Sequence, residues 1–89
     1  MIVARRYLIS GIVQGVGFRF FTEHAASVEG ICGYVRNLPD GSVEAVAEGD
    51  AEAVDRFERA LRRGPRSGRV QNVRIEPLAP EGRKGFTIR

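Results

Sequence analysis

The residues with the clearest chemical potential lie in positions 13–19, Val-Gln-Gly-Val-Gly-Phe-Arg. Gly15 and Gly17 are two residues apart, and glycines with this spacing between a strand and a helix can turn several backbone N–H groups inward. Together with the positive end of the helix, such a ring of amides binds a tetrahedral anion. Arg19 stands at the helix start, where its planar guanidinium can close over the same anion with paired hydrogen bonds. An ordinary strand-to-helix turn with a surface arginine fits the same residues equally well.

Asn37 is the second candidate, because it ends an apolar segment just before the turn residues Pro39, Asp40 and Gly41. As a functional residue it would aim its carboxamide at a water molecule or a ligand. As a structural residue it would start the turn, a role in which asparagine is common. Composition does not decide between these two interpretations.

Several other chemistries lack the residues that they need. Cys32 is the single cysteine and His24 the single histidine, which excludes an internal disulfide, a multi-cysteine metal site and an all-histidine zinc site. Phe20 occupies the place of the third glycine of a dinucleotide fingerprint, and neither a Gly-x-Ser-x-Gly elbow nor a Gly-Lys-Ser phosphate loop is present. We interpret His24 as a half-exposed helix residue and Cys32 as a small core residue.

The basic residues are unusual in type. Fourteen basic and eleven acidic residues give a net charge of +3, and thirteen of the fourteen are arginine. Arginine suits bidentate recognition of anions, although genome composition explains such a bias equally well. A basic run surrounds one loop, and we interpret it as a solvated helix end, with an anionic partner as the alternative. The run consists of Arg62, Arg63, Arg66 and Arg69.

Two helices are predicted to position these groups. Residues 18–29 have apolar positions at helical spacing, and Gly30 follows as a left-handed C-terminal residue. The predicted buried face of this helix consists of Phe18, Phe21, Ala25 and Val28. Asp50 is the predicted cap of a second helix, which Gly64 and Pro65 end. Its predicted buried stripe consists of Val54, Phe57 and Leu61.

Five strands are predicted from β-branched and alternating segments, at residues 7–13, 31–38, 42–48, 70–77 and 86–89. The turn at Pro39, Asp40 and Gly41 joins the second and third strands in a hairpin. Along the third strand, Val43, Ala45 and Ala47 share one face. Glu44 and Glu48 lie on the other face, which we therefore expect to be partly wet.

The order of elements is strand, helix, strand, strand, helix, strand, with a short C-terminal strand added. A chain of 89 residues forms one domain, residues 1–89. The compact solution is an α+β ferredoxin-like sandwich, an antiparallel sheet with two helices on one face. No apolar run reaches the ~18 residues of a membrane span, and no secretory signal is recognisable. We expect a cytoplasmic protein.

Two sequence blocks closely resemble the acylphosphatase family. They are Gly-x-Val-Gln-Gly-Val-Gly-Phe-Arg at 11–19 and Gly-x-x-Gly-Tyr-Val-Arg-Asn-x-x-Asp-Gly-x-Val-Glu at 30–44. Tyr34 replaces the family's usual tryptophan, and Leu38 stands where some members carry a hydroxyl side chain. A similar domain opens the far longer hydrogenase-maturation carbamoyltransferases, whose helix usually begins Arg-Pro-Phe. Here Arg19 is followed by Phe20 and Phe21, and the chain has 89 residues, so we expect a free-standing enzyme.

The resemblance implies hydrolysis of acyl phosphates to a carboxylate and inorganic phosphate, without a metal or another cofactor. It implies that Arg19 and the backbone amides of the loop hold the phosphoryl group and that Asn37 orients the attacking water. The chemistry agrees, because a carboxylate leaving group needs no general acid and a guanidinium with fixed amides can stabilise the phosphoryl oxygens. Arg19 and Asn37 are thus the expected catalytic residues. The expected substrate-binding residues are Gln14, Gly15, Val16, Gly17, Phe18 and Arg19.

Two other functions are alternatives to acyl phosphate hydrolysis. A non-catalytic ferredoxin-like domain would bind a phosphate or another ligand without turnover. An RNA-binding module on the same scaffold would need exposed aromatic residues on its central strands, whereas the third strand offers Glu44, Val46 and Glu48. We therefore expect small acyl phosphates and inorganic phosphate as partners, no nucleic acid and no membrane, and a monomeric protein.

Overall fold

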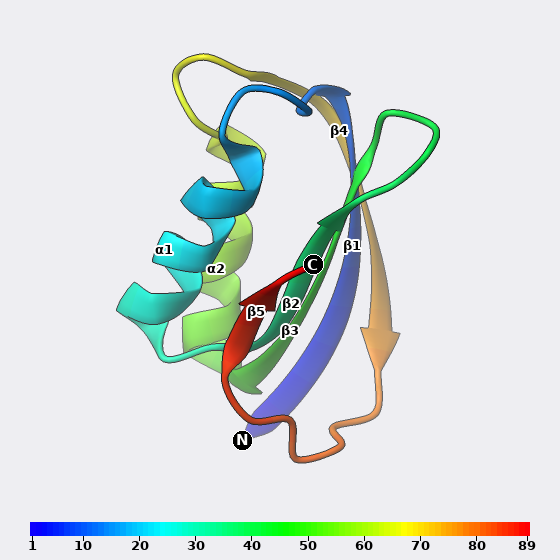
Figure 1. Cartoon of the computed structure of the whole chain (residues 1–89). Helices are drawn as coiled ribbons and strands as arrows, with labels where there is room; N and C mark the ends of the chain where they lie inside the picture. Colours follow the sequence, from blue (N-terminus) through cyan, green and yellow to red (C-terminus); the bar gives the residue numbers. More distant parts are fainter.

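Seven elements follow one another in the computed structural model, which describes residues 1–89 (Figure 1). The helices are α1 (Phe18–Glu29) and α2 (Ala51–Arg63). The strands are β1 (Ile2–Ile12), β2 (Cys32–Asn37), β3 (Val43–Asp50), β4 (Arg69–Leu78) and β5 (Phe86–Ile88). The predicted order of elements is confirmed.

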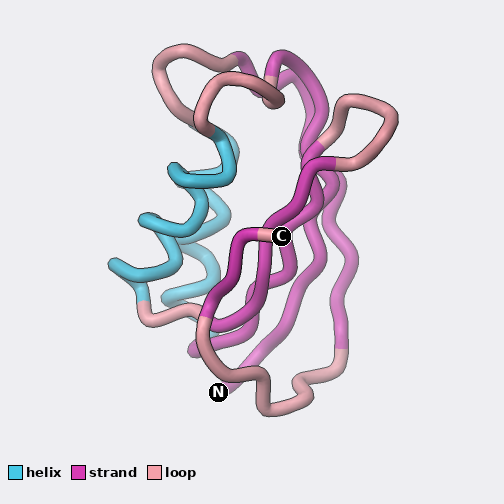
Figure 2. The backbone as a smooth tube through the Cα atoms, in the orientation of Figure 1, coloured by secondary structure: helices cyan, strands magenta, loops and turns pink.

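The strands form one sheet in the order β4-β1-β3-β2-β5, and both helices lie on the same face of it (Figure 2). Helix α1 packs against β2 and β5, and α2 packs against β1, β3 and β4. The ferredoxin-like α+β class is thus confirmed. The added strand β5 pairs in parallel with β2 and not in antiparallel fashion. Its direction follows from its path, because residues 79–85 cross from β4 to the opposite edge of the sheet before β5 begins (Figure 1).

Strand β1 begins at Ile2, five residues earlier than the predicted start at Tyr7. The charged residues Arg5 and Arg6 conceal the strand pattern in the sequence. In the structure Arg5 lies 2.7 Å from the Asp55 carboxylate on α2. Arg6 points to the other face of the sheet and pairs with Glu44 and Glu76 on the neighbouring strands. Ion pairs with α2 and with the neighbouring strands therefore allow β1 to contain two charged residues in succession.

The expectation that Glu44 and Glu48 face water was wrong. Their residues are only 2% and 6% exposed, although the sheet face that carries them has no helix above it. The Glu44 carboxylate accepts hydrogen bonds from Arg6 Nε and Arg36 Nε, each at 2.5 Å. Glu48 accepts from the backbone N–H groups of residues 81–83 and from the Arg83 side chain. Arginine side chains and the crossing segment thus cover both carboxylates.

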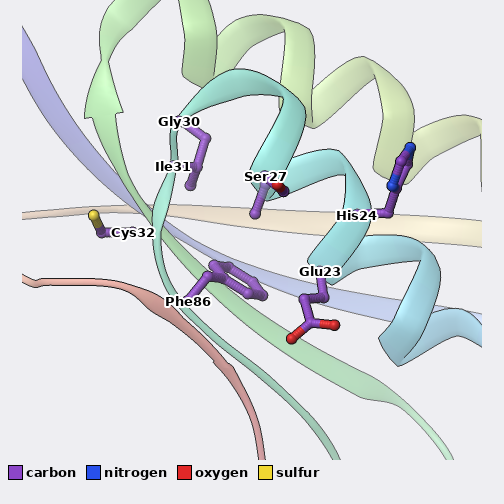
Figure 3. A pocket seen from close by; sticks show the side chains of 8 residues that line it. Glu23, His24, Ser27, Gly30, Ile31, Cys32 and Phe86 are labelled. Carbon is purple, nitrogen blue, oxygen red and sulfur yellow. The ribbon is translucent and has the colours of Figure 1, made fainter.

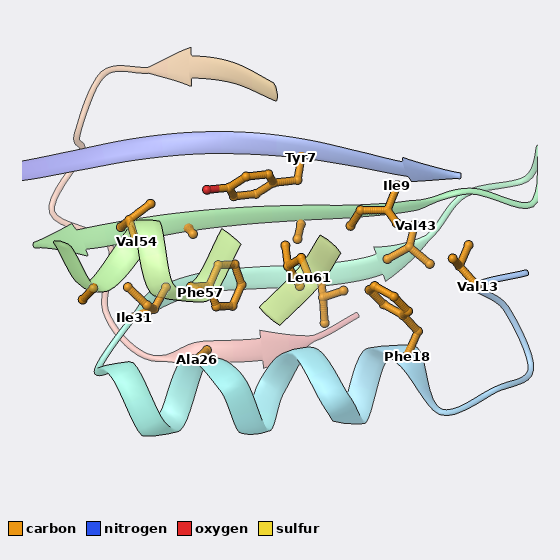
Figure 4. Packing of buried hydrophobic residues seen from close by; sticks show 14 residues of the cluster. Tyr7, Ile9, Val13, Phe18, Ala26, Ile31, Val43, Val54, Phe57 and Leu61 are labelled. Carbon is orange, nitrogen blue, oxygen red and sulfur yellow. The ribbon is translucent and has the colours of Figure 1, made fainter. Parts of the chain in front are cut away.

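Helix α2 buries Val54, Phe57 and Leu61 as predicted, whereas the predicted face of α1 is confirmed only in part (Figure 4). The buried residues of α1 are Phe18, Thr22 and Ala26, and the predicted core residue Val28 is 67% exposed. Thr22 enters the core because its hydroxyl donates a 2.8 Å hydrogen bond to the Phe18 carbonyl, so no polar group is left unsatisfied.

Two smaller predictions concern single residues near this core. His24 is exposed on α1, and the residue is therefore at least as accessible as predicted. Cys32, predicted to lie in the core, is only partly buried at the start of β2.

Candidate active site

A small cavity of about 90 Å³ lies between the β1–α1 loop and the end of β2. It brings together five of the predicted site residues, and its lining is Val13, Gly15, Gly17, Phe18, Arg19, Phe20 and Asn37. Gln14 and Val16, which were predicted with them, do not line it. The cavity has the volume of a few water molecules, so it suits a group the size of PO₃ better than a whole organic phosphate.

The loop supplies free hydrogen-bond donors to this cavity. Gly15 and Gly17 have φ angles of 74° and 77°, in the left-handed region that glycine adopts without steric cost. None of the backbone N–H groups of residues 15–20 donates a hydrogen bond within the protein. Gly17 caps α1 without a side-chain hydrogen bond, so the first turn of the helix also keeps its donors free. Free amides at the positive end of a helix attract an anion.

Arg19 brings a positive charge to the same helix end, where the helix dipole disfavours it. The first turn of α1 contains no acidic residue that could compensate this charge. The guanidinium forms no ion pair with an acidic side chain, and its only protein hydrogen bond runs from Nη1 to the main-chain oxygen of Arg89 at 3.2 Å. A guanidinium has five N–H donors, so most of them remain free for a ligand. The arrangement has the charge and the donors to bind a phosphoryl group.

Asn37 reaches the cavity from the other side, as the last residue of β2. Its residue is exposed, and its carboxamide forms no hydrogen bond within the protein. The turn behind it is well fixed: the Asp40 carboxylate accepts hydrogen bonds from the backbone N–H and the hydroxyl of Ser42. These hydrogen bonds hold the pKa of Asp40 below its ordinary value. Asn37 therefore presents a free amide from a rigid hairpin end, where it can orient a water molecule.

Gln14 connects the two halves of the site. Its Nε2 donates to the carbonyl oxygens of Leu38 and Ser42, at 2.7 and 2.9 Å. The side chain thereby ties the loop that carries the free amides to the turn that follows Asn37. The sequence could suggest that Gln14 belongs to the site, but nothing local reveals that its partners lie 24 and 28 residues further along the chain.

Val16 supports the loop from the opposite side. Its side chain packs against the hydrophobic core. Its carbonyl oxygen accepts a 2.8 Å hydrogen bond from the Ser67 hydroxyl in the α2–β4 loop. The β1–α1 loop is therefore held between the β2–β3 turn and the α2–β4 loop.

Comparison with known protein families decides the assignment. The acylphosphatase family model matches residues 5–88. The chain belongs to the acylphosphatase family. As the resemblance implied, it is an enzyme that hydrolyses acyl phosphates.

Individual acylphosphatases agree over nearly the whole chain. The chain is 52% identical over 85 residues to an acylphosphatase of Koribacter versatilis, covering 94% of this chain and 77% of that protein. It is 48% identical over 86 residues to one of Thermotoga petrophila, covering 97% and 96%. The crystal structure of acylphosphatase from Bacillus subtilis superposes with a TM-score of 0.94 at 35% identity and covers 99% of this chain and 98% of that one.

Larger surface cavities elsewhere do not gather comparable groups. One of about 590 Å³ lies beside α1 and β5 and is lined by Glu23, Ser27, Cys32 and Phe86, among others. His24 also lines this cavity, but Glu23 and His24 point to opposite sides of α1 (Figure 3). No group of three or more His, Cys, Asp and Glu side chains is placed to hold a metal ion. None of the helices is long and apolar enough to cross a membrane.

Proposed function

We propose that the enzyme holds the terminal phosphoryl group of an acyl phosphate with the backbone amides of residues 15–19 and with Arg19, and that Asn37 orients the attacking water. The observation that carries this proposal is that three kinds of group lie around one cavity of about 90 Å³: a guanidinium with no acidic side-chain partner, unpaired backbone amides and a free carboxamide. The small volume leaves the acyl half of the substrate outside.

The reaction needs little from the protein beyond position and charge. The water oxygen forms a bond to phosphorus, and the bond between phosphorus and the carboxyl oxygen breaks. The leaving carboxylate is stable as an anion, so it needs no general acid. Charge on the equatorial phosphoryl oxygens is stabilised by the guanidinium and the amides. The water proton passes to the released phosphate, and the step requires neither a metal nor a strong protein base.

We further propose that the enzyme acts as a cytoplasmic monomer that does not bind nucleic acid. One chain supplies every group of the proposed site. Cys32 is a free thiol, as is usual in the reducing cytoplasm. Tyr34, an aromatic residue on the uncovered sheet face, lies under the Arg89 guanidinium, which occupies a position where a base would stack.

Replacing Arg19 tests the proposal. Arg19→Lys keeps the charge but loses the planar fork, and Arg19→Ala loses both. We expect each to lower kcat/KM for benzoyl phosphate by about a hundredfold or more, the cost of removing one transition-state donor, and to weaken competitive inhibition by inorganic phosphate. Arg74→Lys, at an exposed position in β4, is the matched control. Near-normal turnover of Arg19→Ala would contradict the assignment.

A further inference from the structure

We infer that Tyr34 is a positioning residue, which orients Arg19 through Arg89. The inference rests on the proposed role of Arg19. Neither Tyr34 nor Arg89 lines the cavity of the site. Both lie instead in a surface cavity of about 480 Å³ at the β2–β5 edge of the sheet, together with Arg83 and Lys84.

Three short contacts form a chain from β2 to Arg19. The Arg89 guanidinium lies 3.8 Å from the centroid of the Tyr34 ring, within the range of a cation–π interaction. The Arg89 backbone N–H donates a 2.8 Å hydrogen bond to the Val35 carbonyl. The Arg89 main-chain oxygen accepts a 3.2 Å hydrogen bond from Arg19 Nη1. Arg89 is therefore attached to β2 at two points while it holds the guanidinium of Arg19.

Tyr34 is itself well fixed. It pairs with Val46 of β3 on one side and with Thr87 of β5 on the other, so its backbone lies inside the sheet. Figure 1 shows that the end of the chain follows β5 alongside β2, which places residue 89 close to this position. The ring thus projects from a backbone that is paired on both sides, and it contacts the side chain of Arg89, which follows the edge strand β5.

A restraint on Arg19 matters because nothing else in the protein holds its guanidinium. No acidic side chain pairs with Arg19, and the helix dipole repels its charge. Immobilising a long side chain when the anion binds costs conformational entropy and lowers the affinity for the anion. A contact that already restrains the side chain in the free enzyme removes part of that cost. The hydrogen bond to Arg89 uses one donor and leaves the others for the phosphoryl oxygens. Tyr34 therefore contributes to preorganisation without touching the substrate.

The test combines Tyr34→Leu, which removes the ring, Tyr34→Phe, which keeps it, and Arg89→Met, which removes the cation. The measurements are the inhibition constant of inorganic phosphate, kcat and KM for benzoyl phosphate, and the thermal midpoint. We expect Tyr34→Leu and Arg89→Met each to weaken phosphate inhibition and kcat/KM by about two- to fivefold, the value of one exposed cation–π contact. Tyr34→Phe should restore both quantities.

The double variant Tyr34→Leu/Arg89→Met separates positioning from general damage to the fold. If both residues act through one contact, it should be no worse than the more impaired single variant. Lys84→Met is the matched control, because it removes a positive charge from the same cavity, but Lys84 forms no ion pair and the cation over the ring is that of Arg89. We expect it to leave phosphate inhibition unchanged.

Several results would overturn the inference: additive effects in the double variant, equal losses in Tyr34→Phe and Tyr34→Leu, or a lowered thermal midpoint with unchanged phosphate inhibition. Arg19→Lys measured in the same assay distinguishes this failure from failure of the proposed site. If Arg19→Lys weakens phosphate inhibition and Tyr34→Leu does not, only the role of Tyr34 is refuted. If Arg19→Lys has no effect, the proposed role of Arg19 itself is refuted.

Discussion

Arg19 sits where an ordinary helix would carry an acidic or a capping residue. Helix N-termini are stabilised by Asp, Ser or Thr caps and by acidic residues in the first turn. α2 follows this rule, since Asp50 accepts a hydrogen bond from the Glu52 N–H and Glu52 lies in the first turn. α1 has Gly17 and Arg19 at the corresponding places. A helix whose N-terminus lacks the usual stabilising residues is expected at a functional site.

Asn37→Ala distinguishes orientation of water from binding of the anion. Loss of the carboxamide removes the group that aligns the nucleophile, and misaligned reactants cost about a hundredfold or more in rate. We expect kcat to fall by that amount while the inhibition constant of phosphate stays within about twofold, since the amides and Arg19 remain. Asn72→Ala, at an exposed position in β4, controls for removal of an amide. A parallel loss of phosphate affinity would show that Asn37 binds the anion.

Residues whose role depends on nearby sequence could be predicted, and residues with distant partners could not. Gly15, Gly17 and Arg19 lie within five positions, and their spacing alone suggests an anion site. The hydrogen bonds from Gln14 reach 24 and 28 residues along the chain, and the one from Arg19 to Arg89 spans 70. Only the sheet order, with β5 beside β2, brings residue 89 near the start of α1.

The contrast between features set by nearby residues and features set by distant ones also holds for whole helices and strands. α1 spans Phe18–Glu29, the predicted range, because glycines with positive φ mark both of its ends. Its buried face was predicted only in part. Phe18 is buried as expected, but Thr22 and Ala26 are the other fully buried residues, and the expected Val28 is exposed. In β3 alternation correctly assigned Val43, Ala45 and Ala47 to the core. Alternation could not show that the polar side of the strand is buried as well, because arginines from β1 and β2 cover Glu44.

The covered face of β3 predicts a loss of stability in acid. Burial alone would raise the pKa of Glu44, but the hydrogen bonds from Arg36 and Arg6 outweigh it and hold the pKa below its ordinary value of 4.5. Because the folded pKa is the lower one, the contribution of Glu44 to the free energy of unfolding is complete above pH 4.5. It is lost as the pH falls from there through the folded pKa.

Glu44→Gln should therefore lower the free energy of unfolding at pH 7 by about 1.5–3 kcal/mol, the value of hydrogen bonds to charged groups. The difference from the wild type should shrink below about pH 4. Urea unfolding at several pH values measures both effects. Glu76→Gln is the control, because Glu76 pairs with the same Arg6 from an exposed position and should contribute less than about 1 kcal/mol. A difference that does not change with pH would refute the proposed role of the Glu44 charge.

Considered as a whole, the molecule has the β1–α1 loop of the proposed site and its basic run at the same end. The α2–β4 loop, which carries Arg66, lies against the β1–α1 loop through the hydrogen bond from Ser67 to Val16 (Figure 1). Arg63, Arg66 and Arg69 are exposed and form no ion pair, whereas Arg62 lies 3.7 Å from Glu58. The interpretation of this run as a solvated helix end agrees with its exposure. Its unpaired charges also create a positive potential beside the site.

That potential should draw anionic substrates toward the site and should be screened by salt. We expect kcat/KM for benzoyl phosphate to fall by about tenfold between about 0.01 M and 1 M salt, as the Debye length shortens from about 30 to 3 Å. Arg63→Gln/Arg66→Gln should lower kcat/KM at low salt and flatten its salt dependence, with kcat at saturation unchanged. Arg74→Gln combined with Lys84→Gln removes the same charge from exposed positions in β4 and before β5, and should have a smaller effect. Equal effects of the two double variants would mean that net charge, and not the position of the arginines, governs the attraction.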